Sequence, residues 1–253
     1  MPVTDLQHPS ARYATRLADD ALITGQRLCE WSSRAPTLEE DLALSNVALD
    51  FLGRARLLYT YASELTGLDE DELAFTRDEQ QYENLLLVEL PIGDFAFTMM
   101  RQYLLDTFEQ LFFTALRHSS DTQLAGIASK SVKEIAYHRR RSSQWVRRLG
   151  LGTVESHQRL QDATDTLWGY VDEMFEVDEL EQQLIADGVA VDRRPLKATW
   201  HASVAQLFNE SELQVPDDSW QVNGSRRGVH TEHLGHLLSE MQYLQRTHPG
   251  LQW

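Results

Sequence analysis

The sequence is poor in residues that form cross-links, because Cys29 is the only cysteine among 253 residues. A single thiol excludes an intramolecular disulfide and any metal site built from several cysteines. The sequence also lacks a run of about 18 apolar residues, the length needed to cross a membrane. The N-terminal stretch MPVTDLQHPSARY has no basic segment followed by an apolar one, as a secretion signal would have. These absences predict a soluble protein of the cytoplasm.

Positive charge is scarce as well. The chain has 23 Lys and Arg residues against 39 Asp and Glu residues, which gives a formal net charge of −16. Because the phosphates of nucleic acids repel such a chain, the composition excludes a general affinity for DNA or RNA. It leaves open association with a partner through local basic patches.

Proline and glycine, which interrupt helices, number only 7 and 13. Pro195 is the one proline between Pro91 and Pro216, so long helices have room to form. Helical periodicity predicts seven helices, over residues 10–31, 37–67, 93–118, 121–150, 157–187, 194–212 and 229–247.

A few residues mark where these helices should begin and end. Thr37 and Glu40 have the spacing of a capping box, and Ser10 and Asp121 are candidate N-caps. Gly150 is a candidate glycine just beyond a helix C-terminus.

The first four segments are long, and short links join the first to the second and the third to the fourth. That pattern predicts two antiparallel helix hairpins. We therefore expect an all-α, ferritin-like four-helix bundle with additional C-terminal helices, forming a single domain over 1–253. The core bundle would span about 10–150, and helices within about 157–247 would wrap it.

The 93–118 segment has apolar residues on two faces. One stripe includes Phe95, Met99 and Phe113, and another includes Leu104 and Phe108. A helix covered on two sides either lies at the centre of its own domain or also contacts a partner subunit. The sequence leaves both interpretations open.

A long-helix bundle with many carboxylates invites a test for a di-iron site. Such sites take one Glu from each of two helices and a Glu-x-x-His pair from each of the other two, because residues three apart share a helix face. None of the nine histidines has a glutamate three residues before it, and the one acidic residue at that spacing is Asp5, before His8. The standard ligand pattern is absent.

One histidine nonetheless belongs to an inward stripe of the 121–150 segment. His138 would point into the bundle, and we expect it to be satisfied by hydrogen bonds, with Glu109 or Asp106 as candidate partners. The stripe comprises Leu124, Ala128, Ser131, Ile135, His138, Ser142, Trp145 and Leu149.

The segment HTEHLGH is a second candidate metal site. His230 and His236 are about 120° apart on a helix, too far for three clean ligands to one ion, whereas His233, His236 and Glu240 converge better. His230 also lies on an apolar stripe, which favours a packing role for it.

Basic residues are concentrated in HRRR at 138–141, in Arg147-Arg148 and in Arg226-Arg227. Their outward members could hold phosphates or an acidic partner, and the alternative is a solvated face with ion pairs within the helix. No glycine-rich phosphate loop, nucleophile elbow or Cys-His pairing occurs.

Four stretches of the sequence resemble a known family, the C-type subunits of bacterial phenylacetyl-CoA epoxidases. They are WSSRAPTLEEDLALSNVALDFLGRARLLY, LAFTRDEQQYENLLLVELPIGDFAFTMMRQYLLD, KEIAYHRRRSSQWVRRLGLGT and GVHTEHLGHLLSEMQYLQR. The resemblance covers nearly the whole chain apart from about the first ten residues.

The resemblance implies a ferritin-like subunit that carries no metal of its own. The related A-type subunit has a Glu-Leu-Gly-His-Ala-Arg signature, where this chain has Phe51, Arg54 and their neighbours. Phe51 would replace the Glu and Arg54 the His, while Ile135 would replace the Glu of the pair that His138 completes. Asp106 and Glu109 would remain as a residual polar core. A cationic Arg54 would also repel a nearby metal ion.

The resemblance further implies a complex. Its A-type subunit would hold the di-iron centre and epoxidise the aromatic ring with O₂. A small B-type subunit and a reductase that uses NADPH, flavin and an iron–sulfur cluster would complete it. This chain would hold none of these cofactors, and it could self-associate when alone.

Two further hypotheses remain. The chain could be an independent metalloenzyme whose ligands are Asp20, Asp106, Glu109 and His138. It could instead be a CoA-binding module that uses the face from Arg139 to Arg148.

Overall fold

A computed structural model of the chain describes residues 6, 8–217 and 220–250. The regular secondary structure of these residues is entirely helical, which confirms the all-α, ferritin-like prediction. Every helix in this part of the chain is too short or too polar to cross a membrane.

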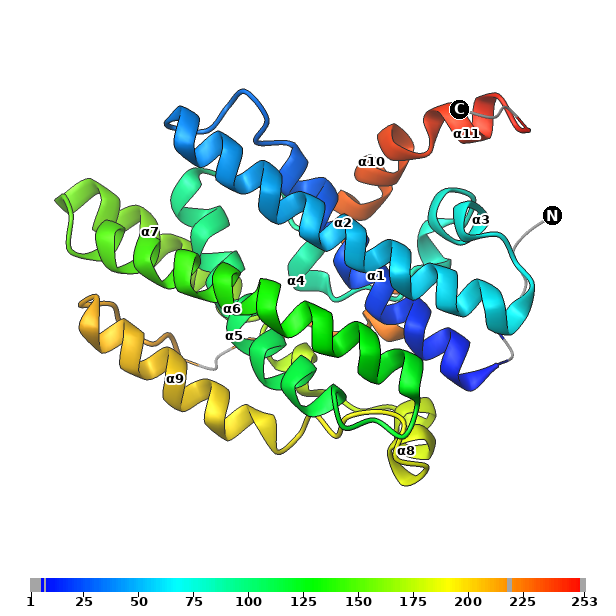
Figure 1. The fold of residues 1–253 in the computed structure, drawn as a ribbon. Helices are drawn as coiled ribbons and strands as arrows, with labels where there is room; N and C mark the ends of the chain where they lie inside the picture. The colour runs from blue at the N-terminus through cyan, green and yellow to red at the C-terminus, as the bar shows by residue number, and fades with distance from the viewer. Residues whose placement is uncertain (1–5, 7, 218–219, 251–253) are drawn as a thin grey trace.

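Four long helices make the bundle (Figure 1): α1 (Pro9–Cys29), α2 (Leu38–Thr66), α5 (Phe95–Leu116) and α6 (Thr122–Gly150). Helix α1 pairs with α2, α5 pairs with α6, and α2 and α6 lie side by side. The link from α2 to α5 contains α3 (Glu70–Phe75), η1 (Glu79–Gln81) and α4 (Leu86–Glu89).

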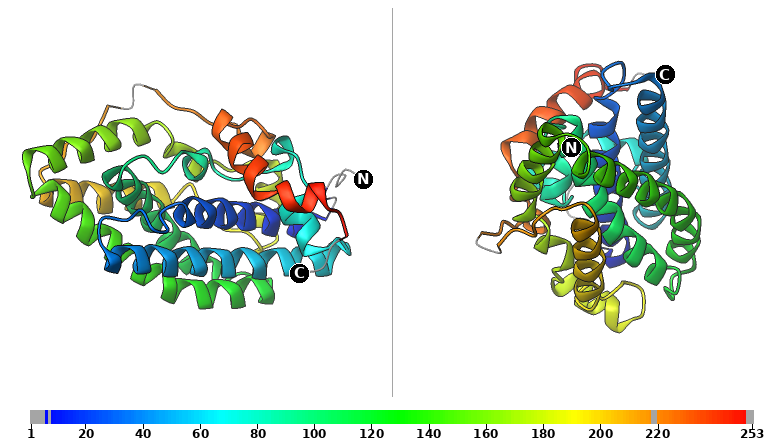
Figure 2. Two further views of the ribbon diagram at one scale, coloured as in Figure 1. Left: turned by 90° about the horizontal axis from the view of Figure 1, so that it is seen from above. Right: turned by 90° about the vertical axis from the view of Figure 1, so that its left-hand side faces the viewer.

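The rest of the chain covers this bundle (Figure 2). Its elements are α7 (Val154–Trp168), η2 (Asp172–Phe175), α8 (Glu179–Ala186), α9 (Leu196–Glu210), η3 (Ser225–Arg227), α10 (Glu232–Met241) and α11 (Tyr243–Thr247). Helices α7 and α9 pack on α5, whereas α10 contacts η1.

Two of the predicted helix ends are confirmed and two are corrected. Thr37 and Asp121 cap α2 and α6 as expected, but α1 begins at Pro9 with His8, not Ser10, as its N-cap. Gly150 is the last residue of α6 and not the residue beyond it. A Cβ atom there would lie 2.6 Å from the carbonyl oxygen of Ser211, so close packing requires the glycine.

Helix α5 is central within its own chain. Most of its side chains are buried, because α6, α7 and α9 pack around it. The two apolar faces therefore reflect burial inside one subunit, and the partner interpretation is not needed to explain them.

The predicted inward stripe of α6 matches the buried residues as far as Ser142, and beyond it the buried positions shift by one residue. Val146 and Gly150 are buried, whereas Trp145 and Leu149 are only partly buried. The predicted stripe followed a period of 3.5 residues, but a straight helix turns once in about 3.6 residues, so the buried face moves forward along the helix.

Two predicted C-terminal helices are each broken in two. The expected helix over 157–187 ends at Trp168, and a turn and η2 precede α8. The ring of Trp220 lies against Gly169, where a Cβ atom would approach it to 2.3 Å. The break therefore coincides with contacts to a segment distant in sequence, and the N–H of Val222 donates to the Gly169 carbonyl oxygen at 2.9 Å. The expected helix over 229–247 divides at Gln242 into α10 and α11.

Candidate functional site

Arg54 of α2 and Glu109 of α5 form an ion pair inside the bundle. Arg54 Nη2 lies 2.8 and 2.9 Å from the two carboxylate oxygens of Glu109. Arg54 is 3% exposed and Glu109 is 5% exposed, so solvent screens the pair weakly. Burial raises the pKa of the Glu109 carboxyl, and the charge of Arg54 opposes that rise.

Two aromatic rings enclose the same guanidinium. Its central carbon lies 4.5 Å from the ring centroid of Phe51 and 4.7 Å from that of Phe113. The negative faces of the rings attract the cation while they exclude water. A carboxylate and two rings therefore hold the Arg54 charge in place.

His138 of α6 is stacked on the ring of Phe51, with 5.3 Å between the ring centroids. Its Nε2 is 2.9 Å from Oδ2 of Asp50, so the predicted partners Glu109 and Asp106 are wrong. The neutral imidazole donates the Nε2 proton to the carboxylate. Burial and the charge of Arg54 together lower the pKa of His138 to about 4, although Asp50 acts to raise it.

His138 should therefore stay neutral when the pH falls from 7 to 5. NMR titration of its ring protons should give a midpoint near 4, as the pKa of about 4 requires. The unfolded chain accepts this proton near pH 6.5, so the contribution of His138 to stability is lost as the pH falls from about 6.5 toward 4. Asp50→Asn should lower the midpoint further. A midpoint at or above 6.5 in the folded chain would contradict the assignment.

Asp106 is buried on α5 beside this cluster. Ser142 of α6 donates a hydrogen bond to its Oδ2 at 2.7 Å, and its Oδ1 has no partner among the described residues. Burial raises the pKa of Asp106 well above its ordinary value, and the negative charge of Glu109 adds to the rise. The environment thus favours the protonated, uncharged acid.

The positions implied by the family resemblance do not suit a di-iron centre. Phe51 and Ile135 are fully buried hydrocarbon side chains without a donor atom. Arg54 brings a positive charge, and His138 is directed to Asp50. Among the described residues, no three His, Cys, Asp or Glu side chains are grouped to hold a metal ion.

The alternative ligand set is divided among separate networks. Asp20 accepts hydrogen bonds from the backbone N–H of Leu85 at 2.6 Å and from Arg226 at 3.0 Å. Glu109, Asp106 and His138 have the different partners described above. Asp20 and Glu109 border one small cavity, but within the described part of the chain no three of these side chains are grouped to hold an ion.

The histidines of the HTEHLGH segment are also separated by the fold. The ring of His230 bridges Glu89 Oε2 and the carbonyl oxygen of Tyr82, each at 2.8 Å. Burial acts to lower the pKa of His230, but the hydrogen bond and charge of Glu89 outweigh it, so the pKa is raised. His230 precedes α10 and binds core groups, whereas His236 is exposed on the helix itself. The packing role predicted for His230 agrees with these contacts.

The basic residues have distinct environments. Arg141 contacts Glu40 of α2, so the Glu40 carboxylate links two helices instead of completing a capping box. The side chain of Arg226 is 9% exposed and binds Asp20 and the carbonyl oxygen of Glu83, so its charge is already used within the chain. Arg139 and Arg140 instead line a groove beside α9.

Sequence reasoning missed a buried ionic network that joins α1 to the segment after α3. The guanidinium of Arg77 contacts Asp19 and also the hydroxyl group of Tyr59 at 3.2 Å. Arg16 contacts Glu83 and Asp178 in the same region. No periodicity identifies such partners, because they are distant in sequence; the only signal was charge on positions of α1 that otherwise look buried.

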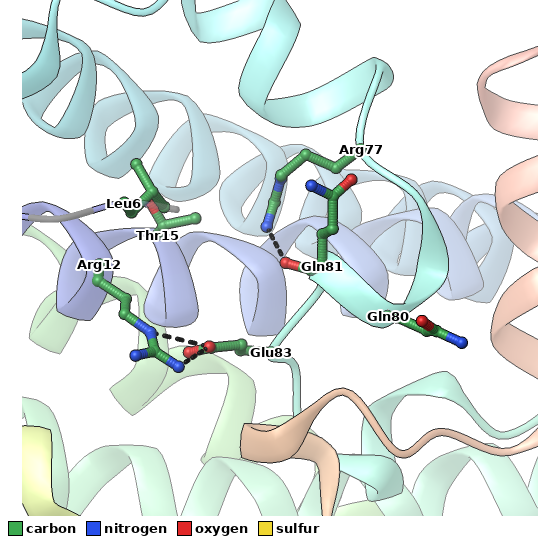
Figure 3. A pocket seen from close by; sticks show the side chains of 7 residues that line it. All are labelled: Leu6, Arg12, Thr15, Arg77, Gln80, Gln81 and Glu83. Atoms are coloured by element: carbon green, nitrogen blue, oxygen red, sulfur yellow. Dashed lines mark hydrogen bonds and ion pairs between the residues drawn. The ribbon is translucent and has the colours of Figure 1, made fainter. Parts of the chain in front are cut away.

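A pocket of about 200 Å³ lies beside this network, between α1 and η1 (Figure 3). Arg12 binds Glu83, and Arg77 donates to the carbonyl oxygen of Gln81 at 2.8 Å. Both guanidinium groups that border the pocket therefore have anionic or carbonyl partners within the chain. The pocket offers no unneutralised cation to a ligand.

The fold and the central cluster define a class: an all-helical, ferritin-like bundle whose core holds a buried arginine–glutamate pair enclosed by two phenylalanine rings. The chain belongs to the family of phenylacetic acid catabolic proteins, whose model matches residues 2–253. It is 51% identical over 242 residues to the C-type subunit of 1,2-phenylacetyl-CoA epoxidase from Escherichia coli strain K12, covering 95% of this chain and 98% of that protein. These matches confirm the resemblance inferred from the sequence.

Proposed function

We propose that this chain is a structural, noncatalytic subunit of a multicomponent phenylacetyl-CoA ring epoxidase in cytoplasmic, aerobic phenylacetate catabolism. It would support a di-iron A-type subunit that performs the oxygen chemistry, together with a small B-type subunit and a reductase. The name of the Escherichia coli relative supports membership of such a complex.

The Arg54–Glu109 pair is the observation that carries the noncatalytic assignment. Glu109 already accepts two short hydrogen bonds from a cation, and Phe51 and Phe113 enclose that cation. A metal ion brought to Glu109 would meet the charge of Arg54 in a region of low dielectric constant, where repulsion is strong. Arg54 supplies the positive charge that balances the buried Glu109 carboxylate, and an arginine side chain has no redox chemistry.

A surface of α2 supports the association. Leu38, Leu42 and Leu49 are 72%, 58% and 63% exposed. Their spacing places them along one side of the helix, and Gly53 on the same side has no atom within 4 Å of a Cβ position. Exposed leucines in a row with a glycine beside them suit close packing against a helix of another subunit. We name these four residues the α2 docking face and propose that it contacts the A-type subunit.

Coexpression tests the proposal. The chain should copurify with the A-type subunit in one gel-filtration peak, and the isolated chain should lack epoxidase activity. Two separate peaks would contradict the partnership. Metal analysis gives a second test: iron near two atoms per chain that is lost in His138→Ala would favour the independent metalloenzyme instead.

A further inference from the structure

A groove of about 390 Å³ runs between α6 and α9, with α5 as its floor. Its walls carry small side chains, Ala136 and Ser143 on α6 and Ser203 on α9, which leave the space open. This volume falls in the range of small-molecule sites, about 300–1,000 Å³. None of the residues that line the groove belongs to the Arg54 cluster or to the α2 docking face.

Positive charge gathers in this groove although the chain is strongly acidic. Arg139, Arg140 and Arg147 line it, and Glu210 is the one carboxylate among its lining residues. Glu210 binds Arg147 at 2.6 Å. Arg139 and Arg140 have no carboxylate at ion-pair distance among the described residues, and Arg140 lies over the ring of Tyr137 at 5.6 Å. The groove thus holds two arginine charges that the chain does not neutralise.

Tyr103 of α5 forms part of the floor of the groove. It donates its hydroxyl proton to the carbonyl oxygen of Ser203 at 3.1 Å, which ties α5 to α9. Burial raises the pKa of Tyr103 to about 12, while the charges of Arg139 and Arg147 act to lower it. These two arginines are about two turns apart on α6 and line the same groove as Tyr103.

We infer that this groove binds the phosphate groups of a CoA thioester. A guanidinium group can donate two parallel hydrogen bonds to the oxygens of one phosphate, and several arginines along one groove match a ligand that carries more than one phosphate. The net charge of −16 would repel a long nucleic acid but tolerates a small anion held at one local patch. This inference rests on the proposed function, because the CoA thioester is the substrate in the name of the relative.

Calorimetry on the full-length chain at low salt tests the site with three probes: CoA, dephospho-CoA and pantetheine, which lacks phosphate. CoA should bind, dephospho-CoA should bind more weakly and pantetheine should not bind. The double variant Arg139→Gln/Arg140→Gln should weaken CoA binding by at least about tenfold, because it removes charge-assisted hydrogen bonds. Glu210→Gln should strengthen binding, because it removes the competing carboxylate and frees Arg147.

Arg148→Gln is the matched control, because Arg148 is an exposed arginine on the same helix that lies over Trp145 outside the groove. It should change CoA binding by less than about twofold. Equal weakening by Arg148→Gln, binding of pantetheine as tight as that of CoA, or no heat with CoA at millimolar concentration would each overturn the inference. Copurification with the A-type subunit is measured separately, so failure of the groove leaves the proposed subunit role testable on its own.

Discussion

Arg54→Ala should destabilise the folded chain by about 3–5 kcal/mol, far more than the loss of an arginine at the surface. The substitution leaves the Glu109 carboxylate buried without the cation that binds it at 2.8 and 2.9 Å. It also opens a space between Phe51 and Phe113. Urea denaturation monitored by circular dichroism measures the change in the free energy of unfolding.

A double variant separates the ion pair from simple loss of packing. Arg54→Met with Glu109→Gln removes both charges and keeps most of the volume, so it should recover most of the lost stability. Arg56→Ala is the matched control on α2, because Arg56 is 78% exposed in its side chain and only loosely paired with Glu70 at 3.3 Å. That change should cost no more than about 1 kcal/mol. Equal costs for Arg54→Ala and Arg56→Ala would refute a structural role for the buried pair.

The second large effect concerns association. Leu42→Asp combined with Leu49→Asp should weaken binding to the A-type subunit on the order of a thousandfold, if each leucine contributes about 2 kcal/mol at the centre of the interface. Both side chains are more than half exposed in the isolated chain, so the fold should keep its helical circular dichroism spectrum. Titration of one subunit with the other, followed by gel filtration, measures the affinity.

Val154→Asp is the control for this experiment. Val154 is 90% exposed at the first position of α7, where an acidic residue suits the helix N-terminus. It should leave the affinity unchanged. Unaltered binding by the leucine variant would place the contact on another surface and reject the α2 docking face.

Local sequence predicted where the long helices form, but it did not predict where two of the C-terminal helices are interrupted. The periodicity of 121–150 with Asp121 as its cap predicted α6 closely. The interruption after Trp168 lies where the ring of Trp220, which is distant in sequence, packs against Gly169. No window of local sequence contains that contact. The residues on both sides of Gly169 have helical periodicity, so local sequence predicts one continuous helix there.

The partner of His138 illustrates the same limit inside the site. The pattern placed His138 on the buried face of α6, and it is 3% exposed. Helical spacing gives the direction of a side chain but not the relative heights of two helices. The offset between α2 and α6 brings Asp50, and neither Asp106 nor Glu109, to its ring.

The sequence by itself determined that this protein is all-helical, that Glu-x-x-His pairs are absent, and that Phe51, Arg54 and Ile135 stand where the family resemblance expects ligands. These properties depend on residue identity and on spacing along one helix. Only the tertiary structure decided that Arg54 binds Glu109, that Arg226 binds Asp20, and that Arg139 and Arg140 share a groove with α9. These ion pairs join helices that are distant in sequence. The packing of side chains determines which helices are neighbours and how far one is shifted along its axis relative to the other.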